Sequence, residues 1–103
     1  MMKRYEVVLA PAAQAQARKV AAWWRENREK ARDLFDDEMA AVLDRLAEAP
    51  KTGLPYRTIR NRQIRRILMA RTSYNVYFEI QEERPLVRVV AVWHAARGHG
   101  PRL

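Results

Sequence analysis

Arginine is concentrated in the second half of the chain, close to the few side chains that could carry out chemistry. The cations that we expect to act together are Arg65, Arg66, Arg71, Arg97 and Arg102. A guanidinium group stays protonated and presents a planar set of donors, which suits phosphates and carboxylates. An imidazole titrates near neutral pH, so His94 could take up and release a proton beside these cations. Tyr77 could donate a proton or stack on a nucleic-acid base.

Together these residue types meet the needs of RNA cleavage without a metal ion. That reaction requires a base for the 2′-hydroxyl group, cations on the phosphate and an acid for the leaving oxygen. The candidate catalytic set is His94, Arg65, Arg97 and Tyr77. A purely structural role competes for each, since a histidine at a strand end often only forms hydrogen bonds and tyrosine is common in strands. We expect His99, which lies between two glycines, to be too poorly fixed for catalysis.

The charge of the chain is divided unevenly between its two halves. Residues 1–50 carry nine basic and nine acidic side chains, whereas residues 51–103 carry eleven basic and three acidic ones. The whole formal net charge of +8 therefore arises in the second half. Such a field favours an acidic partner, either nucleic acid or an acidic protein. Surface arginines also keep proteins soluble, so charge by itself leaves that neutral explanation open.

Other classes of function find little support in the composition. The chain has no cysteine and only two histidines, so we expect neither a metal site nor a cofactor. No apolar run approaches the roughly 18 residues of a membrane span, and the stretch Met1 to Ala10 is too short for a signal peptide. We therefore expect a cytoplasmic protein. One acidic group falls on a predicted helix, and we interpret it as a solvated face; it comprises Asp33, Asp36, Asp37 and Glu38.

Two amphipathic helices are predicted after a short opening strand. Residues 5–9 are rich in strand-forming side chains, and Pro11 suits the first position of a helix. Apolar residues then recur at helical spacing in two stripes, from position 13 to 24 and from 31 to 46. One continuous helix would be unusually long for a chain of 103 residues, so we predict a break near Asn27. Pro50 ends the second helix.

Adjacent tryptophans near the end of the first helix cannot lie on the same face of it. Trp24 continues the apolar stripe and is predicted to face the core. Trp23 is predicted to lie at the edge of the core or partly exposed, where it could contact a partner protein or a second copy of the chain.

Three strands are predicted in the second half, after a loop over residues 50–63. They span residues 64–70, 74–81 and 86–93. The second strand alternates, which predicts one buried face and one face, carrying Tyr77, that is open to water or a ligand. The third is apolar at nearly every position, as expected of a central strand covered on both faces. The tail over residues 95–103 contains two glycines and a proline and is predicted to lack regular structure.

The predicted order is β-α-α-β-β-β, which makes a single α+β domain over residues 1–103. In it a helical hairpin packs on one face of a mostly antiparallel sheet. In this order and at this length the chain resembles the RelE/ParE superfamily of bacterial toxins. The segments that carry the resemblance are Leu-Ala-Pro-Ala-Ala at 9–13, Leu46-Ala47-Glu48-Ala49-Pro50, Ile64-Arg65-Arg66-Ile67-Leu68, Tyr74-Asn75-Val76-Tyr77-Phe78, and the run from Val89 through Trp93 and His94 to Arg97.

The resemblance implies the toxin of a type II toxin–antitoxin system, a growth inhibitor of the kind associated with plasmid stabilisation. Members similar to ParE lack the ribonuclease residues, and those characterised poison DNA gyrase. Members similar to RelE cleave messenger RNA in the ribosomal A site and tend to carry an aromatic or histidine cluster at the C-terminus. The last residues here, 97–103, contain no aromatic side chain and resemble the ParE branch more. Gyrase is therefore the expected target, without nuclease activity, and ribosome-dependent mRNA cleavage is the alternative.

The resemblance also implies a cognate antitoxin, with which the chain is expected to form a hetero-oligomer. Its acidic or amphipathic C-terminal segment would fold onto the toxin, against the edge of the opening strand or the groove beside the helices. A third hypothesis is a nucleic-acid binder without toxicity, whose binding would weaken steeply with salt. The residues expected to bind a partner or target are Arg65, Arg66, Arg71, Arg97, Arg102 and Trp23.

Overall fold

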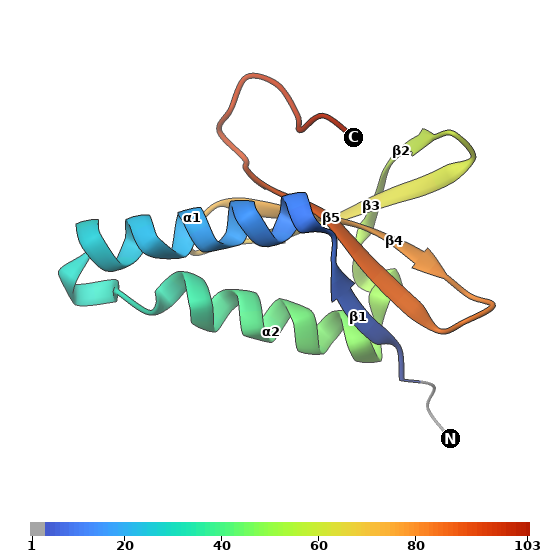
Figure 1. Ribbon diagram of the computed structural model, residues 1–103, viewed down its shortest axis with the longest axis horizontal. Coiled ribbons are helices and arrows are strands. Elements are labelled where there is room, and N and C mark those ends of the chain that lie inside the picture. The colour runs from blue at the N-terminus through green and yellow to red at the C-terminus, as the bar shows by residue number, and fades with distance from the viewer. Residues whose placement is uncertain (1–3) are drawn as a thin grey trace.

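The computed structural model describes residues 4–103, in which a helical hairpin packs against one face of a five-stranded sheet (Figure 1). The α+β class and the hairpin are confirmed. The stretch Met1 to Ala10, judged above to be too short for a signal peptide, begins outside the described residues. In chain order the elements are β1 (Glu6–Leu9), α1 (Pro11–Asn27), the 3-10 turn η1 (Glu29–Ala31), α2 (Leu34–Glu48), the 3-10 turn η2 (Pro50–Thr52), β2 (Leu54–Ile59), β3 (Arg62–Met69), β4 (Tyr74–Gln81) and β5 (Leu86–His94).

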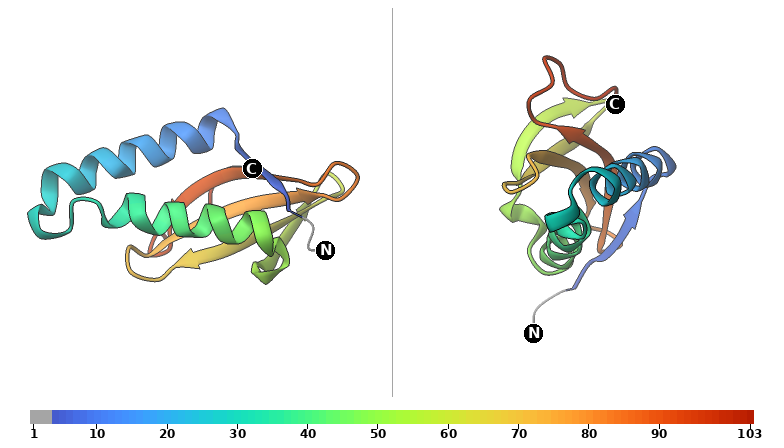
Figure 2. Two further views of the ribbon diagram at one scale, coloured as in Figure 1. Left: turned by 90° about the horizontal axis from the view of Figure 1, so that it is seen from below. Right: turned by 90° about the vertical axis from the view of Figure 1, so that its left-hand side faces the viewer.

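The sheet is mixed, with the strand order β1-β5-β4-β3-β2. Strand β1 pairs in parallel with β5, and every other neighbouring pair is antiparallel. Both helices lie on the same side of the sheet, as the two views of Figure 2 show. Since β1 and β2 are the outermost strands, β1 leaves one backbone edge without a strand partner among residues 4–103. No helix within these residues is long and apolar enough to cross a membrane.

The prediction of a loop over residues 50–63 is wrong, because this segment contains β2 and the turn into β3. Ile59 pairs with Arg62, so Arg60 and Asn61 alone form the turn. Both have positive φ, 50° and 66°, which is the backbone of the two-residue hairpin turn whose twist matches that of the strands. Asparagine is common in such turns but arginine is not. Only one of the two turn residues was therefore of a type that predicts a hairpin turn.

Replacing Arg60 with asparagine is expected to raise the free energy of unfolding by about 1 kcal/mol, since a left-handed backbone strains a long side chain more than asparagine. Urea unfolding of the purified protein measures the change. Arg84→Asn is the matched control, because Arg84 is also exposed and in a turn but does not have positive φ. Equal effects of the two substitutions would assign the gain to charge and not to backbone geometry.

The predicted break between the helices is confirmed, since α1 ends at Asn27. The Asn27 Nδ2 donates to the carbonyl oxygen of Trp23 at 2.9 Å, and the backbone N–H of Arg28 donates to that of Trp24 at 3.0 Å. These bonds satisfy carbonyl groups that a helix end otherwise leaves open. The chain then reverses through η1, which lets the apolar stripes of both helices face the sheet.

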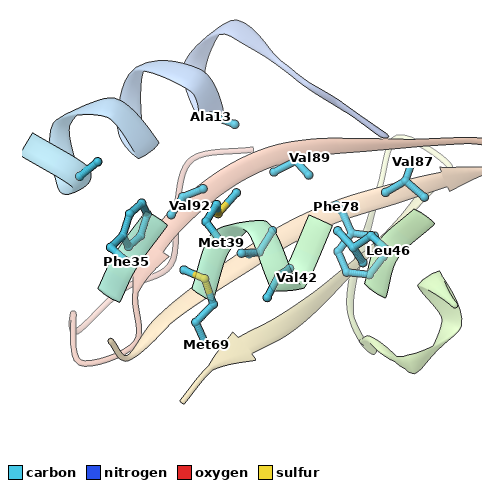
Figure 3. Close-up of a cluster of buried hydrophobic side chains, with 12 residues drawn as sticks. Ala13, Phe35, Met39, Val42, Leu46, Met69, Phe78, Val87, Val89 and Val92 are labelled. Atoms are coloured by element: carbon cyan, nitrogen blue, oxygen red, sulfur yellow. The ribbon is translucent and has the colours of Figure 1, made fainter. Parts of the chain in front are cut away.

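The main hydrophobic core fills the space between the hairpin and the sheet (Figure 3). From the helices it takes two alanines of α1, Ala13 and Ala21, and the apolar stripe of α2, and from the sheet mainly valines. Its fully buried large side chains include Phe35 and Leu46 on α2 and Phe78 on β4. The labelled members in Figure 3 are Ala13, Phe35, Met39, Val42, Leu46, Met69, Phe78, Val87, Val89 and Val92.

The prediction that one face of β4 is open to water or a ligand is wrong. Tyr77 is only 3% exposed and Glu79 only 6%. A second, smaller core covers this face, and its buried members are Ile64, Tyr77 and Ala91. Partly buried hydrophobic residues pack against it, namely Tyr56, Ile59, Val90, Trp93 and Leu103. The alternation of β4 could not reveal this cover, since it comes from β2 and the C-terminal tail.

Glu38 is not part of a solvated acidic face, contrary to the prediction. Its carboxylate accepts hydrogen bonds from the backbone N–H groups of Arg71 and Thr72, at 2.8 and 3.0 Å, and from the Thr72 hydroxyl at 2.6 Å. It thereby joins the middle of α2 to the turn between β3 and β4. The neighbouring Asp36 behaves more as expected, in a half-exposed ion pair with Arg25.

Candidate functional site

The face of the sheet that points away from the helices carries a pocket of about 190 Å³, which we call the sheet-face pocket. The end of β5 and the following tail form one side of it, and β2, β3 and β4 form the rest. Its lining residues are Tyr56, Arg66, Asn75, Tyr77, Trp93, His94, Ala95, Arg97, Gly98, His99 and Gly100.

Aromatic rings hold the arginines of this pocket in place. The Arg66 and Arg57 guanidinium carbons lie 5.1 and 5.2 Å from the centre of the Tyr56 ring. The Arg97 guanidinium carbon lies 4.3 Å from the centre of the Trp93 ring. A guanidinium group stacked on a ring keeps its in-plane N–H donors free for an anion. Arg66 and Arg97 are therefore fixed cations with open donors.

The C-terminal tail lacks regular structure, as predicted, but it is not loose. The Trp93 indole N–H donates to the backbone oxygen of His99 at 2.8 Å, and Pro101 is buried. Figure 2 shows the tail returning toward β2 and β3. Added bulk at Gly100 would meet the Tyr56 hydroxyl at 2.5 Å, so the tail passes directly against that ring. The expectation that His99 is poorly fixed is therefore wrong.

The two histidines of the pocket differ in which nitrogen is available. His94 Nδ1 accepts a hydrogen bond from the backbone N–H of Ala96 at 3.1 Å. In its neutral form His94 thus carries its proton on Nε2, and neither nitrogen is a free acceptor. His99 Nδ1 lies 3.1 Å from the carbonyl oxygen of Gly100, which can only accept. The neutral His99 ring then leaves Nε2 free to accept a proton.

Two tyrosines, Tyr74 and Tyr77, lie near His94 and under the Tyr56 ring respectively. Burial raises the pKa of the Tyr74 hydroxyl above its usual value, and the charge of Arg97 opposes this in part. Tyr74 packs edge-on against His94, with the ring centres 4.9 Å apart. Tyr77 is buried under Tyr56, at 4.9 Å between ring centres. The Tyr77 ring is therefore part of the pocket floor and cannot stack on a ligand as predicted.

The arginines predicted to act together are divided among several places. Arg66 pairs with Tyr77 and shares its face, whereas Arg65 pairs with Phe78 and so lies on the helix side of the sheet. There the Arg65 guanidinium group donates to the carbonyl oxygen of Gly53 at 2.7 Å. Only Arg66 and Arg97 of the predicted group line the sheet-face pocket, while Arg102 is an exposed residue of the tail.

Arg71 and Trp23 line a different pocket of about 440 Å³, which we call the helix-end pocket. It lies between the end of α1 and the turn that follows β3. Trp23 is 46% exposed, as the prediction of a partly exposed position required. His94 lines both pockets and separates them. The lining residues are Trp23, Trp24, Arg28, Arg71, Thr72, Tyr74 and His94.

Sequence reasoning missed the role of Tyr56, which supports two arginines and meets the tail. It lay in the segment mistaken for a loop, although Leu54 to Ile59 does contain strand-forming residues. Trp93 ends the strand predicted to be covered on both faces, yet its ring packs against the Arg97 guanidinium group and its indole N–H fixes the tail. The available signals were the arginine that directly follows Tyr56 and the arginine four positions after Trp93.

Solved structures similar to this fold include chains of bacterial toxin–antitoxin systems. A chain of the toxin–antitoxin complex RelBE2 from Mycobacterium tuberculosis is 19% identical, with a TM-score of 0.62 over 94% of this chain and 98% of that one. A chain of the chromosomal ParDE system from P. aeruginosa is 10% identical, with a TM-score of 0.68 over 89% and 97%. The isolated E. coli RelE toxin is 18% identical, with a TM-score of 0.53 over 92% and 88%.

The sequence itself was compared with protein families and with curated proteins. Comparison with curated proteins finds no match. The family model described as "ParE toxin of type II toxin-antitoxin system, parDE" matches residues 7–98. This match runs from β1 into the tail and includes every lining residue of both pockets except His99 and Gly100. The predicted resemblance to the RelE/ParE superfamily is therefore confirmed. The chain belongs to the ParE family of toxins of type II toxin–antitoxin systems.

Proposed function

We propose that the protein is a toxin that a cognate antitoxin holds inactive and that, once released, acts on DNA gyrase without cutting nucleic acid. The observation that carries this proposal is the match of the ParE family model over residues 7–98. The state of His94 is consistent with it, because Nδ1 is already engaged by Ala96 and the neutral ring cannot act as a base. The sheet-face pocket would serve as a binding surface for an acidic part of the target.

The antitoxin is proposed to be an acidic or amphipathic chain bound to this one as a hetero-oligomer in the cytoplasm. One of the similar structures is a toxin–antitoxin complex and another comes from a toxin–antitoxin system, which supports a partner of this kind. Strand β1 at the sheet edge offers unpaired backbone groups to an added strand. Acidic side chains of the partner would then meet Arg66 and Arg97, where Coulombic attraction speeds and orients association.

Induction of the gene in a bacterial host, followed by growth and by a reporter of DNA damage, tests the proposed target. We expect growth arrest with DNA-damage signalling, no cleavage of ribosome-bound messenger RNA, and inhibition of purified gyrase in a supercoiling assay. His94→Ala should arrest growth as strongly as the unaltered protein, because the imidazole has no catalytic role in this proposal. The double variant R66Q/R97Q should lose most of the arrest, whereas Arg18→Gln, an exposed residue of α1, should not.

A ribosome-dependent ribonuclease is the second candidate, favoured by one observation. His99, whose Nδ1 is engaged by the Gly100 carbonyl oxygen, lines the same pocket as two cations, Arg66 and Arg97, and a base beside cations is the combination that RNA cleavage needs. Cuts in messenger RNA that disappear in His99→Ala would replace the gyrase proposal by this one. A protein that causes no growth arrest, but binds nucleic acid in a salt-dependent way, would contradict both.

A further inference from the structure

The helix-end pocket contains two cations whose charge no acidic side chain balances. Within residues 4–103 neither Arg28 nor Arg71 forms an ion pair, whereas the nearby Arg25 pairs with Asp36 at 3.0 Å. The Glu38 carboxylate, which lies next to the Arg71 backbone, accepts hydrogen bonds from the backbone and hydroxyl donors of the β3–β4 turn and forms no ion pair with the Arg71 guanidinium group. The pocket therefore presents two guanidinium groups without an ion-pair partner among residues 4–103.

The Arg28 guanidinium group is held in place by two indole rings. Its central carbon lies 5.1 Å from the centre of the Trp23 ring and 5.8 Å from that of the Trp24 ring. The two rings meet edge to face at 5.9 Å. An arginine stacked in this way loses little further side-chain entropy when it binds, and its N–H edge suits both oxygens of a carboxylate.

The end of α1 does not repel an anion here as strongly as a bare helix C-terminus would. The carbonyl oxygens of Trp23 and Trp24 already accept hydrogen bonds from Asn27 Nδ2 and from the Arg28 N–H. The negative end of the helix dipole is thus partly compensated at the pocket wall.

Trp23 adds an apolar contact next to the cations. Its side chain is 46% exposed, although the neighbouring Trp24 packs against the main core. Exposed tryptophan beside arginine is typical of the centre of a protein–protein contact. The pocket thus combines a candidate carboxylate site with an apolar surface, because Arg28, Arg71 and Trp23 line the same cavity.

We propose that the helix-end pocket anchors an acidic segment of a partner protein, with a carboxylate between Arg28 and Arg71 and an apolar side chain on Trp23. The inference rests on the proposed function in one respect, that the partner is the antitoxin. A peptide fits better than single-stranded nucleic acid, because Arg28 already occupies a face of both indole rings on which bases would stack.

The test uses the full-length toxin and the peptide acetyl-Glu-Leu-Glu-Leu-amide, followed through the indole N–H signals in NMR spectra. We expect the Trp23 and Trp24 signals to shift with a Kd on the order of 1 mM, and the Trp93 signal to stay. Arg28→Gln and Arg71→Gln should each weaken binding about tenfold, as expected for the loss of a charge-assisted hydrogen bond. Arg18→Gln, the control on an exposed part of α1, should bind as the unaltered protein does.

A charge exchange makes the test specific for the pocket. Arg28→Glu should abolish binding of the glutamate peptide and allow binding of acetyl-Lys-Leu-Lys-Leu-amide. The inference is overturned if acetyl-Gln-Leu-Gln-Leu-amide binds equally well, if Trp93 shifts in place of Trp23, or if a thymidine oligonucleotide shifts Trp23 at lower concentration than the peptide does.

The outcome can be separated from that of the proposed function. The peptide titration needs neither growth arrest nor an antitoxin, so it can succeed even if the protein is not toxic. Conversely, suppose that the protein arrests growth and is neutralised by its antitoxin, while its Trp23 and Trp24 signals do not shift when the glutamate peptide is added. That result would contradict the helix-end site and leave the proposed function intact.

Discussion

Replacing Glu38 with alanine is expected to lower the free energy of unfolding by about 2–4 kcal/mol. The carboxylate accepts three hydrogen bonds from the turn between β3 and β4, and Thr72, which supplies two of them, is only 4% exposed. Alanine would leave these donors without their acceptor in a place that water reaches poorly. Urea unfolding followed by circular dichroism measures the loss.

The size of the effect depends on the position of Glu38 and not on its charge. Asp44→Ala removes an exposed carboxylate from the same helix and should change stability by less than about 0.5 kcal/mol. Glu38→Gln keeps one acceptor oxygen and should fall between the two. If Glu38→Ala were as harmless as Asp44→Ala, the hydrogen bonds of Glu38 would not be what stabilises the turn between β3 and β4. Glu38 would then also not be what positions Arg71 in the helix-end pocket.

Replacing Gly53 with alanine is expected to cost about 1–3 kcal/mol, because there is no room for a methyl group. A Cβ atom at this position would lie 2.5 Å from Cζ of the Phe78 ring and 3.3 Å from the carbonyl oxygen of Arg66. Phe78 is completely buried in the main core, so its ring cannot swing away. Thermal or urea unfolding measures the loss of stability.

Gly98→Ala is the matched control, since nothing lies within 4 Å of an added Cβ atom there, and it should leave stability unchanged. In a background that carries Phe78→Leu, the substitution Gly53→Ala should lower the free energy of unfolding by less than it does in the unaltered protein. A double-mutant cycle would report this difference as coupling between the two positions. Gly53 immediately precedes β2, the strand that carries Tyr56. We therefore also expect Gly53→Ala to weaken growth arrest, and a stable, fully toxic variant would contradict the role of β2 in the site.

Local patterns were sufficient for the helices and for most of the strands. The apolar stripes placed α1 and α2, and Pro11, Asn27 and Pro50 marked their ends correctly, because helix signals depend on neighbours within about one turn. Strands β4 and β5 were found for the same reason. Strand β2 was missed because its turn uses Arg60 in a backbone conformation for which arginine has no preference.

The sequence by itself determined the two helices, four of the five strands, the family and the positive charge of the second half. Only the tertiary structure decided which charges act together, because strand alternation sends Arg65 and Arg66 to opposite faces of the sheet and the pairing with β4 sets which face is which. Contacts between residues far apart in the chain also fixed what no local pattern encodes: Glu38 on a distant turn, and the tail at Gly100 against the Tyr56 ring. A contact between residues far apart in the chain leaves no periodic trace in the sequence, and the proposed binding surface depends on such contacts.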